Sequence, residues 1–189
     1  SGTTKGSVKL VTTNVGVGTQ VGNVNFVASV SASNSGSSRY KLEVDAGGDI
    51  VVTGSISLPG GSWDNNSNYG YDVDFSAAGN VVLNSSLNTS GQSAATSSWV
   101  YSNAGNVLIE AGGYVRVSGS ILSSGGSNSS TVTRVNSDGG TVSISGAGGV
   151  TMSSDIITFN GYNGTSGYGT NGSITISSGK TSVTSGGVN

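Results

Sequence analysis

The segment Gly48-Asp49-Ile50-Val51-Val52-Thr53-Gly54-Ser55-Ile56 recurs in varied form five times along the chain. Each copy begins with a glycine, and three apolar residues follow at relative positions 0, +2 and +6, beginning two residues after that glycine. The copies span residues 22–30, 48–56, 79–87, 113–121 and 148–156, so their starts lie 26, 31, 34 and 35 residues apart. A repeat with this period indicates stacked supersecondary units, each burying its apolar face against its neighbours.

A pair of alternating apolar residues precedes four of these copies by a fixed step of eight residues. The pairs are Leu42/Val44, Val73/Phe75, Val107/Ile109 and Val142/Ile144, and small connectors rich in Ala and Gly follow them. Alternation bounded by Gly and Asn predicts short strands joined by tight turns, with glycine supplying positive φ. Val8/Leu10 fits the same strand with a step of 16, which indicates an insertion at 14–20. Ile174/Ile176 opens a sixth copy, in which Val183 falls one residue late.

One unit is expected to contain three strands, at about 41–45, 50–53 and 56–58, with parallel pairing to the next unit. This arrangement predicts an all-β, right-handed parallel β-helix of about five to six rungs. The chain is expected to be one domain, 1–189, with an irregular first rung at 1–40, regular repeats at 41–173 and an incomplete last rung at 174–189. Two stacked inward columns are predicted from Val24, Phe26, Ile50, Val52, Val81, Leu83, Val115, Val117, Val150 and Met152.

Composition excludes several function classes. The 189 residues include 33 Gly, no Cys and no His, and the net charge is −2. Disulfide scaffolds, thiol chemistry, histidine metal sites and a Ser-His-Asp triad are therefore excluded. The chain has no basic stripe for nucleic acid and no apolar run long enough to span a membrane. Low charge with abundant Ser, Thr, Asn and Gly favours an extracellular location, at a bacterial cell surface.

Long polar excursions leave each unit after its third strand, at 57–72, 88–106, 122–141 and 157–173. Insertions of a solenoid gather on one face, which is often the binding face. These excursions hold most of the aromatic residues, which are candidates for contact with carbohydrate or a partner, the alternative being local packing of the loops: Trp63, Tyr69, Tyr71, Trp99, Tyr101, Phe159, Tyr162 and Tyr168.

A small acidic cluster with one lysine is predicted on the outer face of the first strands. Glu43 and Asp74 occupy equivalent positions in successive units, and Asp72 corresponds to Lys41. Three interpretations apply. Glu43, Asp72 and Asp74 are candidate Ca²⁺ ligands, because hard cations take carboxylate oxygens. The carboxylates alternatively form a glycosidase-like acid pair. The third interpretation is a solvated face in which Lys41 pairs with Asp72, without any cofactor.

The segment 107–126, which reads Val-Leu-Ile-Glu-Ala-Gly-Gly-Tyr-Val-Arg-Val-Ser-Gly-Ser-Ile-Leu-Ser-Ser-Gly-Gly, resembles the repeat region of filamentous haemagglutinin-like exoproteins and autotransporter passengers. The resemblance extends over about residues 22–180. It implies a surface-exposed β-helical rod used in adhesion, biofilm or envelope structure. The repeat of that family carries no catalytic residues to transfer. The Asn-Pro-Asn motif of the family's secretion domain is absent from this sequence.

Two function classes remain in competition. The first is a non-enzymatic extracellular structural or adhesive rod, and the second is a carbohydrate-binding or polysaccharide-degrading β-helix protein. An ice-binding solenoid is a third, disfavoured by the irregular Thr spacing. The unprotected strand edges at both ends predict either a piece of a longer rod or a subunit stacking end to end on other copies of itself, the third alternative being a capped monomer. The candidate joint residues are Val8, Leu10, Val15, Val17, Ile174, Ile176 and Val183.

Overall fold

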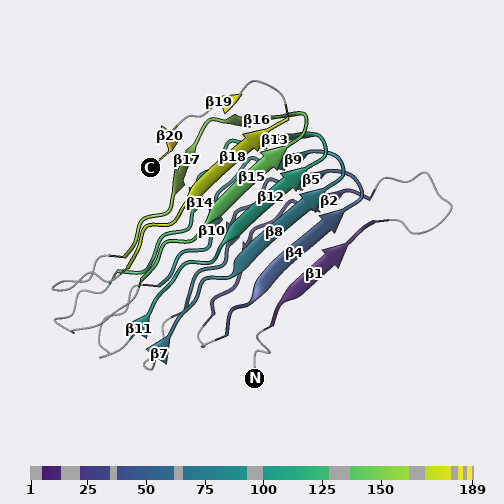
Figure 1. Cartoon of the computed structure of the whole chain (residues 1–189). Coiled ribbons are helices and arrows are strands. Elements are labelled where there is room, and N and C mark those ends of the chain that lie inside the picture. The colour runs from purple at the N-terminus through teal and green to yellow at the C-terminus, as the bar shows by residue number, and fades with distance from the viewer. Residues whose placement is uncertain are drawn as a thin grey trace.

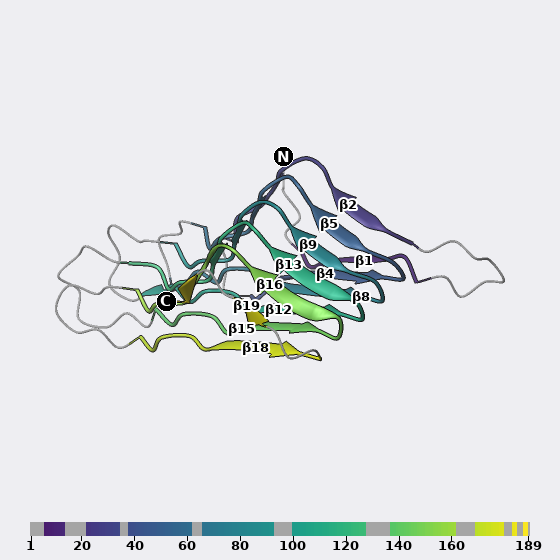
Figure 2. The same ribbon diagram turned by 90° about the horizontal axis from the view of Figure 1, so that it is seen from above.

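The protein is a parallel β-helix, as the computed structural model shows. The structure describes residues 6–13, 22–34, 38–61, 66–92, 100–127, 137–161, 169–179, 183–184 and 187–188. Every regular element within these ranges is a strand, and every strand pair is parallel. Three six-stranded sheets form the walls of the coil, with strands of successive turns stacked side by side (Figures 1 and 2).

Each turn contributes one strand to each sheet, in the order A, B and C. Sheet A contains β1 (Val8–Val11), β4 (Lys41–Ala46), β8 (Asp72–Ala77), β12 (Val107–Ala111), β15 (Val142–Gly146) and β18 (Ile174–Ser178). Sheet B contains β2 (Val24–Phe26), β5 (Ile50–Val52), β9 (Val81–Leu83), β13 (Tyr114–Val117), β16 (Gly149–Met152) and β19 (Val183–Thr184). Sheet C contains β3 (Val30–Ser31), β6 (Ile56–Ser57), β10 (Leu87–Asn88), β14 (Ile121–Leu122), β17 (Asp155–Ile157) and β20 (Gly187–Val188).

The apolar repeat positions form the core as predicted. Val24, Ile50, Val81, Val115 and Val150 are successive partners in sheet B, and the column two residues further on stacks in the same register. From the second to the fifth turn these inward side chains are almost completely buried, whereas Val24 and Phe26 in the first turn are half-buried. Stacking therefore makes one continuous core from a few branched side chains per turn.

The last turn departs from the expectation drawn from its spacing. Val183 pairs with Val150 and Thr184 with Thr151, so β19 is in register with sheet B. The connection from Ser178 to Val183 is one residue longer than the connection from Gly146 to Val150, yet both ends are in register. The inward apolar residues set the register of the strands, and the length of a connection does not. Repeats of unequal length therefore still stack.

The prediction that the corner glycines adopt positive φ is wrong for all but one of the described glycines. Only Gly149 has a positive φ, of 131°. At most of the others close approach requires glycine, because a Cβ would lie less than 3.0 Å from an atom elsewhere in the chain. A Cβ on Gly79 would lie 2.3 Å from Asp49 Oδ1, and a Cβ on Gly113 would lie 2.2 Å from Asn80 Oδ1. Glycine is present at these corners because the side chain of the preceding turn occupies the space.

The corners contain ladders of side-chain oxygens that accept backbone N–H groups of the following turn. Asp49 N–H donates to Asn23 Oδ1 (2.8 Å), Asn80 N–H to Asp49 Oδ1 (2.7 Å) and Tyr114 N–H to Asn80 Oδ1 (3.0 Å). Asn103, Asp138 and Thr170 form a second ladder of the same kind. These bonds satisfy donors at positions where the strands bend and the regular sheet pairing is interrupted.

Asn80→Asp is expected to destabilise the protein at pH 7 by about 1 kcal/mol. Asn80 Nδ2 donates to Asp49 Oδ1 (3.1 Å), and the variant replaces that donor with a second carboxylate. The difference in the free energy of unfolding between the variant and wild type should shrink as the pH falls towards 3, because protonation of either carboxyl removes the repulsion. Urea unfolding at several pH values measures it. Asn25→Asp is the control, since Asn25 lies opposite Val51; an equal and pH-independent loss in both variants would contradict the ladder.

The excursions begin and end in a narrow neck of two packed backbone layers. Gly105 N–H donates to Thr89 O (2.8 Å), and equivalent bonds join Tyr71 to Leu58, Gly140 to Ser123 and Gly172 to Thr158. The side chains enclosed here are small and mostly polar, including Thr89, Ser102, Ser123 and Ser137. The tips fall largely outside the described residues. Among the described residues of the excursions, β7 (Asn66–Ser67) and β11 (Val100–Tyr101) pair in parallel, so the excursions contain strand of their own.

Candidate binding groove on sheet A

The outward side chains of sheet A stand in columns, because equivalent residues of parallel in-register strands lie directly beside one another. Two columns matter here. Column one is Ser7, Lys41, Asp72, Asn106, Thr141 and Ser173, and column two is Lys9, Glu43, Asp74, Leu108, Ser143 and Thr175. The sequence prediction that Glu43 and Asp74 are equivalent, and that Asp72 corresponds to Lys41, is confirmed by this register.

A shallow groove of about 270 Å³ lies between these columns over the second to fifth turns. Its lining residues are Lys41, Asp72, Val73, Asp74, Asn106, Val107, Leu108, Thr141 and Ser143. The side chains of Val73 and Val107 are buried in the core, so these residues contribute backbone to the floor. The walls are the polar side chains of column one on one side and Asp74, Leu108 and Ser143 on the other.

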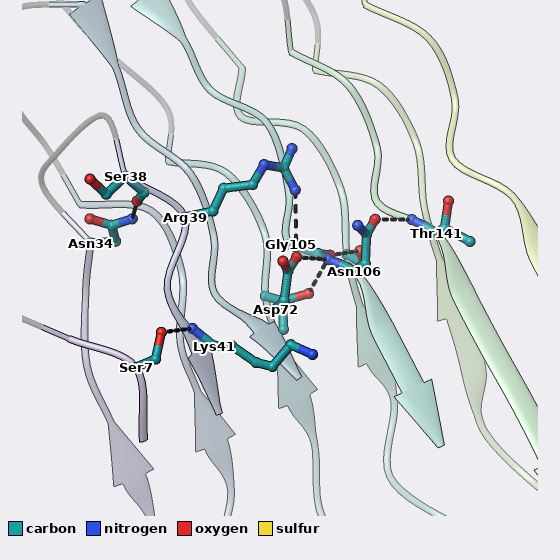
Figure 3. Close-up of polar contacts among 11 residues, drawn as sticks. Ser7, Asn34, Ser38, Arg39, Lys41, Asp72, Gly105, Asn106 and Thr141 are labelled. Atoms are coloured by element: carbon teal, nitrogen blue, oxygen red, sulfur yellow. Dashed lines mark hydrogen bonds and ion pairs between the residues drawn. The ribbon is translucent and has the colours of Figure 1, made fainter. Parts of the chain in front are cut away.

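Column one is held in place by hydrogen bonds between successive turns (Figure 3). Asp72 Oδ1 accepts the backbone N–H of Asn106 (2.7 Å), and Asn106 Oδ1 accepts the backbone N–H of Thr141 (2.9 Å). Arg39 also approaches Asp72 in this view, with Nη1 at 3.5 Å from Oδ1. The groove wall is therefore fixed before any ligand arrives.

Each carboxylate of the predicted acidic cluster has a cationic partner. Lys9 Nζ lies 2.5 Å from Glu43 Oε1, and Lys41 Nζ lies 3.1 Å from Asp74 Oδ2. The predicted pair between Lys41 and Asp72 is not formed: Lys41 reaches diagonally to Asp74, and Asp72 pairs with Arg39. The physical reason is that Arg39, two residues before Lys41, brings a second cation that the sequence argument did not place.

The protonation behaviour of the cluster follows from these pairs. The hydrogen bond to Asp74 raises the pKa of Lys41, and the hydrogen bond from Lys9 lowers the pKa of Glu43. A raised lysine pKa means that the stabilisation by Lys41 is present throughout neutral pH and is lost only as the pH rises through that raised value. None of these shifts places a proton donor or acceptor near neutral pH, as general acid–base catalysis would favour.

Among the described residues, no three His, Cys, Asp or Glu side chains converge as a metal-binding group. The Ca²⁺ interpretation of Glu43, Asp72 and Asp74 therefore gains no geometric support, since their oxygens face lysine and arginine. We expect EDTA to change the thermal unfolding midpoint by less than about 1 °C. A differential scanning measurement with EDTA and then with excess Ca²⁺ tests this, and a midpoint that falls with chelator and recovers with Ca²⁺ would restore the metal site.

The predicted aromatic candidates separate into different environments. Tyr71 is buried and its ring lies 5.6 Å from that of Tyr40, so it belongs to the packing of the neck, where burial raises its pKa. Tyr69 is half-buried beneath the guanidinium of Arg39, at 4.9 Å, and Phe159 is half-exposed. The backbone of Tyr101 lies in β11. Trp63, Trp99, Tyr162 and Tyr168 lie outside the described residues.

The candidate joint residues that are described occupy the outer strands of the stack. Val8 and Leu10 lie in β1, Ile174 and Ile176 in β18, and Val183 in β19. Val15 and Val17 lie outside the described residues. Val8 is 52% exposed and Leu10 38% exposed, although both belong to the inward column that is buried in the next turns. Ile174 and Ile176 are half-buried and pack against the core.

Sequence reasoning missed Arg39, Asn106, Leu108, Thr141 and Ser143 as members of the site. The signal was present in the repeat, because Asn106 and Thr141 occupy the position of Lys41 and Asp72 in the next two units. Aligning the units on their inward residues, and then reading each outward position down the stack, would have brought these residues together.

Comparisons with known protein families, with curated proteins and with solved structures find no match to this chain. The described residues also contain no helix with the length and apolarity needed to cross a bilayer. The fold and the groove thus rest on the sequence and the geometry of the chain itself.

Proposed function

We propose that this chain is a non-enzymatic structural and adhesive β-helix protein, acting as a rod or as part of one outside the cell, at a bacterial surface. The observation that supports this most is the unbroken stack: all three sheets continue through six strands in one register. Such a core has no natural limit, because each turn is buried only by its neighbours. The resemblance of segment 107–126 to filamentous haemagglutinin-like repeats supports the same function.

The exposed inward residues of the first turn support continuation of the stack. Val8 and Leu10 present an apolar face, and no described strand other than β4 pairs with β1, which favours pairing with a further strand. That strand is supplied either by another copy of the chain or by the rest of a longer rod. In the first case β18 of one copy would pair with β1 of the next, with Ile174 beside Val8 and Ile176 beside Leu10.

Electron microscopy of the protein in its native form tests the rod. Six turns at about 4.8 Å per turn give a length of about 29 Å, so we expect particles or filaments clearly longer than this along one axis. Particles that stay no longer than one chain at high protein concentration would contradict the proposal.

An assay for new reducing ends on neutral and acidic polysaccharides tests the competing function: turnover would favour the polysaccharide-degrading protein.

A further inference from the structure

The groove on sheet A combines a fixed polar wall with an apolar contact. Asp72, Asn106 and Thr141 are linked across three turns by side-chain hydrogen bonds to backbone N–H groups. Leu108, in the opposite wall, is a half-exposed apolar side chain surrounded by polar ones. A wall that needs no rearrangement lowers the entropic cost of binding, so a shallow groove of this kind suits a ligand with many weak contacts.

The charges around the groove discriminate between ligand classes. The lining contains Lys41 and two carboxylates, and each carboxylate has a cationic partner: Asp74 pairs with Lys41, and Asp72 pairs with Arg39, which is not part of the lining. An anion placed there would meet both carboxylates, and a cation would meet the ammonium group of Lys41. A charged ligand therefore gains little from the groove, whereas an uncharged ligand disturbs neither pair.

The remaining hydrogen-bonding groups suit hydroxyls. The amide nitrogen of Asn106 makes no hydrogen bond to any described residue, and Ser143 and Thr141 present hydroxyl groups in the same groove, where Thr141 Oγ1 accepts from Ser173 Oγ (3.3 Å) and keeps its own proton to donate. The second oxygens of the carboxylates add acceptors. The amide nitrogen can donate a hydrogen bond to a sugar hydroxyl, the carboxylates can accept one, and the protein hydroxyls can do either. Leu108 can contact the C–H face of a sugar ring.

We propose that the sheet A groove is a binding site for an uncharged oligosaccharide lying along the axis of the β-helix. Adjacent turns repeat the wall at about 4.8 Å, so successive sugar rings would meet successive turns: Asp72 and Asp74, then Asn106 and Leu108, then Thr141 and Ser143. The inference concerns the outer face of sheet A only. It is independent of the proposed rod, and its failure would leave the expected particle length unchanged.

The experiment is a titration of ¹⁵N-labelled protein with uncharged tri- and tetrasaccharides of glucose, mannose, galactose and N-acetylglucosamine, followed by the backbone amide signals. At least one is expected to bind, with the largest shifts at Asn106, Leu108 and Thr141. Ser143→Tyr should fill the groove and weaken binding at least tenfold. Ser145→Tyr is the matched control, because Ser145 is the next outward residue of β15, is equally half-buried and lies outside the groove; it should change affinity less than twofold.

Two further arms keep the test decisive. If Ser143→Tyr lowers the unfolding midpoint, Leu108→Ser replaces it, and the affinity for the saccharide is expected to fall about fivefold. Asp74→Asn leaves Lys41 without its partner and should raise the affinity for an acidic trisaccharide at least fivefold over wild type. The proposal is overturned if no uncharged saccharide binds, if the shifts map elsewhere, or if Ser143→Tyr and Ser145→Tyr weaken binding equally.

Discussion

Val81→Asp is expected to lower the free energy of unfolding by more than about 4 kcal/mol, enough to unfold much of the protein. Val81 is completely buried between Ile50 and Val115 of the neighbouring turns. A carboxylate at this position would be surrounded by aliphatic side chains of the stacked column, with no cation or donor to pair with. Loss of the stacked valine contacts adds to this cost.

Val82→Asp is the matched control, because it makes the same change one residue further along β9 on the outer face. Val82 is half-exposed and its partner in the next turn is Arg116, so the new carboxylate is solvated and has a cation beside it. We expect a change within about 1 kcal/mol. Circular dichroism followed through urea unfolding measures both variants, and similar losses in both would contradict the assignment of inward and outward faces.

Gly105→Ala is expected to cost about 3 kcal/mol or more, an effect at the upper end for one added methyl group. A Cβ on Gly105 would lie 1.9 Å from Tyr71 O and 2.3 Å from Tyr71 C. These are backbone atoms of the preceding turn and cannot rotate away. Gly105 O also accepts hydrogen bonds from Thr89 Oγ1 (3.1 Å) and Ser123 Oγ (2.7 Å), so a shift of Gly105 would break contacts in the neck.

Gly6→Ala serves as the control, since a Cβ at Gly6 would meet nothing within 4 Å. Thermal unfolding of the two variants should therefore give a large fall in the midpoint for Gly105→Ala and almost none for Gly6→Ala. A Gly105→Ala variant as stable as wild type would mean that Gly105 and Tyr71 of the preceding turn lie further apart than the structure places them.

The sequence predicts the fold well because the pattern of inward apolar residues is visible in the sequence and also determines how the strands stack. The repeat positions of Ile50, Val52 and Ile56 indicate which side chains face inward, and the inward side chains set the register of the parallel strands. The same rule brings β19 into register despite its longer corner. Local spacing alone misled at Val183 because a connection can absorb a residue that a strand cannot.

The site was less predictable because it depends on contacts between turns on the outer face. Lys41 has two carboxylates within reach, at the directly opposite Asp72 and the diagonal Asp74, and sequence spacing cannot choose between them. Arg39 decides the outcome by pairing with Asp72. The corner glycines were misinterpreted for a similar reason, since a glycine needed for positive φ and one needed for close approach look the same in a sequence.

Cysteine cross-linking tests the in-register parallel stack most directly, and the natural chain contains no cysteine to interfere. Ser76 and Glu110 are partners on the outer face of β8 and β12, whereas Leu108 is the partner of Asp74. Neighbouring strands lie about 4.8 Å apart, within the Cα separation of a disulfide. We expect the Ser76→Cys/Glu110→Cys variant to form an intramolecular disulfide on mild oxidation and the Ser76→Cys/Leu108→Cys variant to remain reduced. Equal cross-linking of both pairs, or cross-linking of the second pair alone, would contradict the register on which the core, the ladders and the groove depend.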